Sequence, residues 1–335
     1  MKKLLSAILC VVLVLSVLSI VGCNKTEDKE PLKLGLGVYT EVSKATNADG
    51  DTNGQGQAAI TYAAVLLDAN GKIVKCVLDT ADNKVDYTSE GKAVANDSFK
   101  TKYEQGSAYN MKLYGGAAKE WFEQADAFCS VVVGKTADEV KALVAEGDKG
   151  TDEVINAGCT IMVNEFALAI ENAVKNATAS EATADAALKL GIATVQTCKD
   201  ATEDKNGENK IETTAFAAAV DGEGKIIAAM SDCVQISFGF DAKGASTFDT
   251  TKAVTSKRNA GANYGMASYG ADLNGDGTIK EWFEQANAFD AACVGKTAGD
   301  VAALMGENNY GSADLQIAGC TILVNGFVAA ASKIG

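Results

Sequence analysis

The sequence predicts an α+β protein made of two similar halves, and three observations support this. Segments KEWFEQA, VGKTA and AGCTI begin at positions 119, 133 and 157, and recur at 280, 294 and 318. Apolar, β-branched runs separated by turn residues open each half. Helical patterns then follow, without the strand–helix alternation that is typical of a parallel sheet. We therefore expect antiparallel strands followed by helices, twice over.

The repeat extends upstream of these segments with small changes in spacing. Matching pairs are LG at 34–35 and 190–191, GKI at 71–73 and 224–226, and Tyr109 and Met111 with Tyr264 and Met266. Two copies are therefore expected at 33–174 and 189–335, joined by an Ala/Thr/Glu linker at 175–188. Each copy has about 140 residues, enough to bury a core, so each is expected to fold alone.

Local patterns place the elements within each copy. Asn70-Gly71 between two apolar runs, 58–67 and 72–78, is a strong hairpin signal, and 213–230 repeats this arrangement. Residues 120–132 have apolar residues at helical spacing, which places Trp121 and its counterpart Trp282 in the core. A capping box at 136–139 predicts a short helix, and 161–174 predicts a final apolar helix.

Composition excludes several classes of function. The chain of 335 residues is 47% apolar and 22% charged, so it can bury substantial cores. It has no histidine, which excludes Ser-His-Asp and Cys-His catalysis and histidine-ligated metals. Arg258 is the single arginine and the net charge is −14, so nucleic acid is not an expected partner.

The N-terminus resembles a bacterial lipoprotein signal. Two lysines precede an uncharged apolar run that ends in Ile-Val-Gly-Cys at position 23. We expect a signal peptide at 1–22, a lipid-anchored stalk at 23–32, and a diacylglyceryl group on Cys23, which holds the protein on the membrane lipid. A plain secretory signal and an uncleaved membrane anchor are the alternatives.

Seven cysteines remain after Cys10 and Cys23, and none lies in a CxxC pair, so zinc-ribbon and iron–sulfur sites have no support. An odd number cannot pair completely within one chain, and burial as small apolar residues is the simplest interpretation.

Two further motifs have ordinary explanations. Gly134-Lys135-Thr136 lacks the upstream glycine of a Walker loop and predicts a helix end, a turn and a new N-cap. Asp272, Asn274 and Asp276 resemble the first half of a calcium loop, but position 12 is a phenylalanine, so a solvated turn is favoured.

The segment AGCT is the most informative one. An acidic residue stands seven positions before each threonine, and an apolar helix is predicted after it. Each threonine would then lie at a helix N-terminus, where it is either an N-cap or an anion site. The residues are Glu153, Gly158, Cys159 and Thr160 in the first copy, and Asp314, Gly319, Cys320 and Thr321 in the second.

Taken in order, these motifs resemble the FMN-binding lipoproteins, of the pheromone-type lipoprotein family, that act in flavin-based extracellular electron transfer in Gram-positive bacteria. The resemblance covers the lipobox, the tandem domains, the strand–turn–strand, the Tyr-x-Met segment, the KEWFEQA helix, VGKTA and the terminal Thr-Ile. Cys159 and Cys320 stand where the family has alanine, and Glu153 stands where it has aspartate.

The resemblance implies a function. A separate Mg-dependent flavin transferase would esterify FMN to Thr160 and Thr321, giving two covalent flavins, with Tyr109, Met111, Tyr264 and Met266 as flavin contacts. The protein would relay electrons from a membrane quinone-linked dehydrogenase to an external acceptor, on the extracytoplasmic face of the membrane. It would be a carrier, not an enzyme. A non-redox surface lipoprotein with the threonines as helix caps, and a direct flavin reductase, are the alternatives.

The predicted anchor can be tested with Cys23→Ala, which removes the thiol that would be lipidated. We expect the variant to move from the membrane fraction to the soluble extracytoplasmic fraction, measured by fractionation and immunoblotting. Unchanged membrane retention would contradict the lipoprotein interpretation.

Overall fold

The computed structural model describes residues 30–96, 98–269 and 279–335, and residues 31–335 form one compact unit. The predicted signal peptide, Cys23 and most of the stalk lie outside the described residues. So do Asp272, Asn274 and Asp276 of the calcium-like segment.

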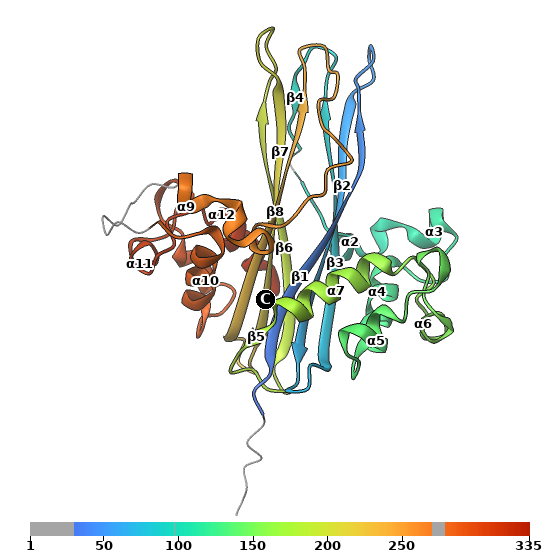
Figure 1. Cartoon of the computed structure of the whole chain (residues 1–335), viewed down its shortest axis with the longest axis vertical. Coiled ribbons are helices and arrows are strands. Elements are labelled where there is room, and N and C mark those ends of the chain that lie inside the picture. Colours follow the sequence, from blue (N-terminus) through green and yellow to red (C-terminus); the bar gives the residue numbers. More distant parts are fainter. Residues whose placement is uncertain (1–29, 97, 270–278) are drawn as a thin grey trace, which may run out of the picture. The chain divides into compact units, whose positions relative to one another are not determined.

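Two antiparallel sheets form the centre of this unit (Figure 1). The strand order is β4-β3-β2-β1-β5 in the first sheet and β6-β7-β8 in the second. The strands are β1 (Lys33–Thr46), β2 (Gly54–Leu67), β3 (Ile73–Tyr87), β4 (Ala93–Val94), β5 (Thr178–Ala179), β6 (Ala187–Lys199), β7 (Gly207–Val220) and β8 (Ile226–Phe240).

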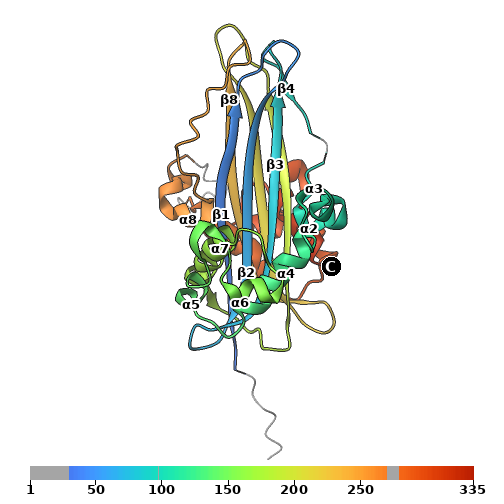
Figure 2. The same ribbon diagram turned by 90° about the vertical axis from the view of Figure 1, so that its right-hand side faces the viewer.

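Helices cover the outer face of each sheet, as Figures 1 and 2 show from two directions. Those of the first half are α2 (Lys102–Gln105), α3 (Met111–Gly115), α4 (Trp121–Val132), α5 (Ala137–Lys141), α6 (Asp152–Ala157) and α7 (Asn164–Asn176). Those of the second half are α8 (Lys257–Ala260), α9 (Met266–Tyr269), α10 (Trp282–Cys293), α11 (Ala313–Ile317) and α12 (Asn325–Ala331). Short 3-10 helices lie at Gly106–Tyr109, Glu146–Asp148, Gly261–Tyr264, Asp300–Leu304, Glu307–Asn309 and Ser332–Ile334.

The central strands are apolar on both faces because each face is covered by a different layer. In β2 the side chains of Ile60, Tyr62 and Leu66 face the other sheet, whereas Val65 and Leu67 face the helices of the first half. Alternate residues of a strand point to opposite faces, so a strand between two layers reads as a continuous apolar run. The unit is therefore a four-layer sandwich of helices, sheet, sheet and helices.

The sheets pack with reciprocal contacts of the kind found across a two-fold axis. Ala48 N–H donates to Gly244 O at 2.8 Å, and Ala201 N–H donates to Gly91 O at 2.8 Å. Each residue of one bond lies 153 positions from its counterpart in the other. Beside them, the rings of Tyr87 and Phe240, which are themselves 153 positions apart, stack with their centroids 4.5 Å apart. The halves thus meet as an isologous dimer does.

The predicted α+β class is confirmed, but the expectation that each copy folds alone is not supported. One apolar cluster is built from the inner faces of both sheets, so neither half encloses it by itself. The strand register also corrects the expected match of Leu34-Gly35 with Leu190-Gly191. In the pairing of β1 with β2 and of β6 with β7, Gly191 occupies the position of Gly37, not that of Gly35. In the part of the chain that the structure describes, no helix is long and apolar enough to cross a membrane.

Expressing residues 31–182 and 183–335 as separate chains tests the shared core. Each chain would expose its inner sheet face, so we expect either chain, when made alone, to aggregate or to unfold with weak cooperativity. Co-expression should restore a soluble one-to-one complex, measured by size-exclusion chromatography with light scattering. Two monomeric halves that each unfold cooperatively would contradict this expectation.

Candidate functional site

The repeated polar residues of the first half meet at Thr160. Gln124, on α4, is 1% exposed, and its Oε1 accepts hydrogen bonds from the N–H of Thr160 at 2.8 Å and from its Oγ1 at 3.1 Å. Gln124 Nε2 donates to Lys119 O at 3.0 Å and to Met111 Sδ at 3.3 Å. One buried amide therefore joins the KEWFEQA helix, the Tyr-x-Met segment and the AGCT loop.

The second half builds the same junction around Thr321. Gln285 Oε1 accepts from the N–H of Thr321 at 2.8 Å and from its Oγ1 at 2.9 Å, while Nε2 donates to Lys280 O and Met266 Sδ. A backbone N–H only donates and a carbonyl only accepts, so the orientation of each glutamine amide is determined. Each threonine hydroxyl must use its proton on the glutamine, and among the described residues no group donates a hydrogen bond to its lone pairs.

The glycine and cysteine of AGCT have structural roles. Gly158 and Gly319 have φ of 104° and 100°, a region that favours glycine. A Cβ at either position would meet the neighbouring lysine Nζ, 2.1 Å from Lys119 and 2.0 Å from Lys280. These lysines donate to the carbonyl before each glycine, at 3.4 Å. Cys159 and Cys320, each 0% exposed, pack in the helical cores, so the expected burial is confirmed for both.

The predicted helix start at the threonines is wrong. α7 begins at Asn164 after the N-cap Val163, and α12 begins at Asn325 after Val324. The apolar pattern continues upstream of both helices, but Met162 and Leu323 form isolated β-bridges there instead. Neither threonine is a helix cap, so an anion site at a helix N-terminus is not available to them.

The acidic residues of the motif lie away from the threonines. Glu153 is on the exposed first turn of α6 and pairs with Lys135 at 3.0 Å, and Asp314 is exposed on the first turn of α11. No hydrogen bond joins either one to its threonine in the described residues. The expected core positions of Trp121 and Trp282 are confirmed, each at 2% exposure.

A cavity of 730 Å³ lies beside Thr321. Its volume is within the range of small-molecule and cofactor sites. Tyr264 and Met266 line it, as do Gly319 and Gln285. Its mouth has apolar side chains that are partly exposed, with Tyr310 at 42% and Leu323 at 50%. Of the predicted flavin contacts, the structure therefore brings Tyr264 and Met266 to a hollow that contains the predicted attachment residue.

The cavity wall is positively charged overall. Lys210, Lys257 and Lys280 line it together with Glu212. Lys257 Nζ lies 2.7 Å from Glu212, and over the rings of Tyr264 and Trp282. Burial opposes the charge on Lys257, yet its pKa is raised because Cys233 and Glu212 lie beside it. Burial raises the pKa of Glu212, but Lys257 and Lys210 shift it further downward, so the pair is charged at neutral pH. No repeated motif signals this pair in the sequence, since Ala59 stands at the position of Glu212 in the first half.

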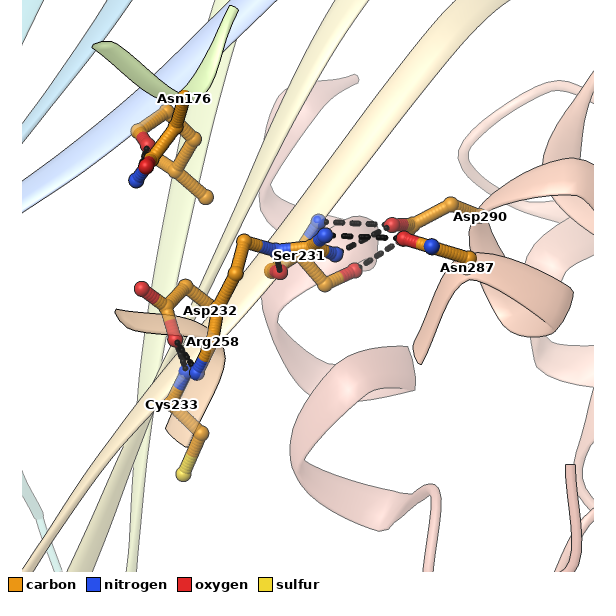
Figure 3. Close-up of polar contacts among 8 residues, drawn as sticks. Asn176, Ser231, Asp232, Cys233, Arg258, Asn287 and Asp290 are labelled. Carbon is orange, nitrogen blue, oxygen red and sulfur yellow. Dashed lines mark hydrogen bonds and ion pairs between the residues drawn. The ribbon is translucent and has the colours of Figure 1, made fainter. Parts of the chain in front are cut away.

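The two helices that frame the cavity are held to β8 by the single arginine (Figure 3). Arg258, at the start of α8, donates through Nη2 to Asp290 of α10 at 3.1 Å, and through Nε to Ser231 O of β8 at 2.7 Å. Its Nη1 donates to Asn287 at 2.8 Å. Asp290 also accepts from the N–H and the hydroxyl of Ser231. The first half has Tyr103 and Cys129 at the positions of Arg258 and Asp290, so this brace belongs to the second half.

Metal ligation finds no support in the residues that the structure describes. They contain no group of three or more cysteine or acidic side chains that could hold an ion. The seven cysteines described are free thiols, five of them buried.

Comparison with known proteins gives one short likeness. A chlorophenol reductase from Desulfitobacterium hafniense is 34% identical over 95 residues, covering 24% of this chain and 29% of that protein. The chain thus spans less than a third of the length of this relative. No protein-family model matches, and no solved structure matches.

The brace in Figure 3 can be tested by denaturation. Arg258→Met leaves Asp290 buried without its cation, and breaking a buried pair in this way costs about 3–5 kcal/mol of unfolding free energy. Arg258→Met combined with Asp290→Asn removes both charges and should recover most of the loss. Lys225→Met, at an exposed pair with Glu223, is the control and should cost under about 1 kcal/mol. Urea titration measures all three, and a loss from Arg258→Met no larger than that of the control would contradict the structural role.

Proposed function

We propose that this protein is a lipid-anchored, extracytoplasmic electron carrier that holds FMN covalently on threonine. The observation that carries the proposal is the cavity beside Thr321, which contains the predicted attachment hydroxyl and two predicted flavin contacts. The expectation of a second flavin, on Thr160, rests on the repeated motif alone.

The residues of the cavity fit a flavin nucleotide in size and in chemistry. Tyr264, Met266 and Phe327 offer an apolar wall for a planar ring system. Lys280 lies against Gly319, two residues from the attachment hydroxyl, so its ammonium can neutralise a phosphodiester there. FMN supplies reversible one- and two-electron chemistry when bound, while the protein supplies tethering and tuning of its potential.

Attachment requires an activated donor, because a hydroxyl does not displace water from a free phosphate monoester. We infer a flavin dinucleotide donor and a transferase that uses Mg²⁺. Thr321 Oγ1 forms the new O–P bond, the pyrophosphate P–O bond breaks, a mononucleotide leaves, and the hydroxyl proton passes to the surrounding water. Gln285 orients the hydroxyl by accepting its hydrogen bond, which points the lone pairs of Thr321 Oγ1 away from the glutamine. The backbone N–H of Thr321, held by the same oxygen, fixes the loop.

In the proposed pathway a membrane quinone-linked dehydrogenase donates electrons and an external acceptor receives them. A carrier needs no substrate pocket beyond that of its cofactor, and the cavity beside Thr321 would then be filled by the flavin itself. The lipid on Cys23 would keep the protein within reach of a membrane donor, because two or more acyl chains anchor stably.

A direct flavin reductase is a second candidate, and the short likeness to a protein named for chlorophenol reduction favours it. Reduction of an acceptor by purified protein with a chemical donor, at a rate that saturates with acceptor concentration, would distinguish this candidate from a carrier. A non-redox ligand-binding lipoprotein would also use the cavity, but it would never carry a flavin adduct.

Replacement of the attachment hydroxyl tests the proposal. Protein made beside a flavin transferase should remain yellow after denaturation and gain the mass of FMN less one water. Thr321→Val keeps the side-chain shape and removes the oxygen, so the adduct at that site should be lost completely. Thr321→Ser keeps a hydroxyl and should retain part of it. Loss of the hydrogen bond to Gln285 should lower stability by about 1 kcal/mol in the valine variant. No adduct on the natural sequence, with another acceptor protein modified in the same host, would overturn the proposal.

A further inference from the structure

The halves differ at a position that faces the threonine site. Gly326, on α12, lines the cavity of the second half, and its counterpart 161 positions earlier is Glu165, on α7. A Cβ at Gly326 would lie 2.8 Å from Thr214 Oγ1, so even a methyl group would crowd this wall. The space that glycine leaves in the second half is therefore occupied by a carboxylate side chain in the first.

Contacts in the first half show where that side chain goes. Thr61 is the counterpart of Thr214, and its Oγ1 donates to Glu165 Oε2 at 3.3 Å. Burial raises the pKa of Glu165, and the neighbouring Glu41 carboxyl raises it further, while Lys102 opposes the shift. The strand register places Glu41 at the position of Val195, which lines the cavity in the second half.

The charge of the wall changes with these residues. The cavity of the second half has three lysines and one glutamate, Glu212. In the first half Glu41 and Glu165 stand at the positions of Val195 and Gly326, while Ala59 replaces Glu212 and Gln57 replaces Lys210. Asp82 stands at the position of Gln235, and Lys44 and Lys149 at those of Thr197 and Tyr310. Glu165 is half-buried and Glu41 is exposed, and carboxylates that lie close together repel each other and any further negative charge. A phosphodiester-linked flavin, which gains electron density on reduction, would meet the carboxylates of Glu41 and Glu165 in the first half, at the positions where the second half has Val195 and Gly326.

We propose that Thr321 is the single flavin attachment site, and that Glu165, together with Glu41, excludes the flavin from the Thr160 site. This inference rests on the proposed function. It narrows the sequence-based expectation of two flavins to one, with the first half keeping the same threonine–glutamine junction but no room for the ring system.

The natural protein gives the first test. Intact mass and peptide mapping, after expression beside a flavin transferase, should show one FMN per chain, on the peptide that contains Thr321. Two adducts, or one on Thr160, would overturn the inference and leave the proposed function standing. No adduct, while another acceptor protein is modified in the same host, would remove the proposed function itself.

Exchange of the wall residues gives the second test. Glu41→Val with Glu165→Gly gives the first half the residues of the second at these two positions, and should raise the count from one adduct to two. The adduct on Thr321 reports within the same molecule that the variant has folded, so one adduct there and none on Thr160 would overturn the role of the two glutamates. Glu171→Gly, at an exposed position of the same helix, is the matched control and should leave one adduct.

The reciprocal change, in the second half, tests the inference through loss of the existing adduct on Thr321. Gly326→Glu should lower occupancy of Thr321 at least tenfold, and Gly326→Gln separates the effect of bulk from that of charge. A thermal unfolding curve checks that both variants are folded. Full occupancy of Thr321 in folded Gly326→Glu would overturn the inference.

Discussion

The packing of the two sheets against each other is the constraint on which the other features depend. Each sheet has an apolar inner face that packs against the other sheet, and the reciprocal bonds of Ala48 and Ala201 fix how they meet. Since the inner faces are occupied, the helices pack on the outer faces. The helices α4 and α10, which carry Gln124 and Gln285 of the two threonine junctions, lie on opposite sides of the sandwich (Figure 1). Hydrophobic burial on this scale dominates the folding free energy of a domain.

Many of the residues that recur in both halves hold a helix, α4 or α10, to the AGCT loop beside it. Gln124 and Gln285 each accept hydrogen bonds from the N–H and the hydroxyl of a threonine. In each half a lysine side chain also lies against the AGCT glycine and donates to the carbonyl of the preceding alanine. Leaving either buried glutamine amide without its partners would cost free energy, which explains why glutamine and threonine recur together. The repeated residues therefore build a common frame, and the differences between the halves lie in the walls around it.

Local elements could be predicted from the sequence because their signals are local. The hairpin at Asn70-Gly71, the capping box at Thr136 and the buried tryptophans follow from turn chemistry and helical spacing, and the structure has all three. The helix start at Thr160 could not be placed, because Ile161 and Val163 continue the apolar pattern while the backbone there is not helical. The alternating Leu-Gly-Leu-Gly at 34–37 allowed two alignments, and only strand pairing distinguishes them.

Longer-range features had no sequence signal of their own. The continuous apolar run of β2 indicates that both faces are buried, but not that the second half of the same chain supplies one cover. The cavity depends on Gly326, which lies outside the segments that recur in the sequence. It also depends on Thr214 of β7, more than a hundred positions earlier in the chain. Such a site becomes visible only when the elements are placed in space.

The shared core also has an evolutionary consequence. After a gene duplication, one copy is usually free to decay, because the other still performs the task. Here a deletion of either copy would expose the sheet face of the survivor, so selection for solubility retains both, whatever happens to their chemistry. The outer faces can drift apart while the inner faces must change together, and a chain of this kind can carry two unlike sites on one indivisible scaffold.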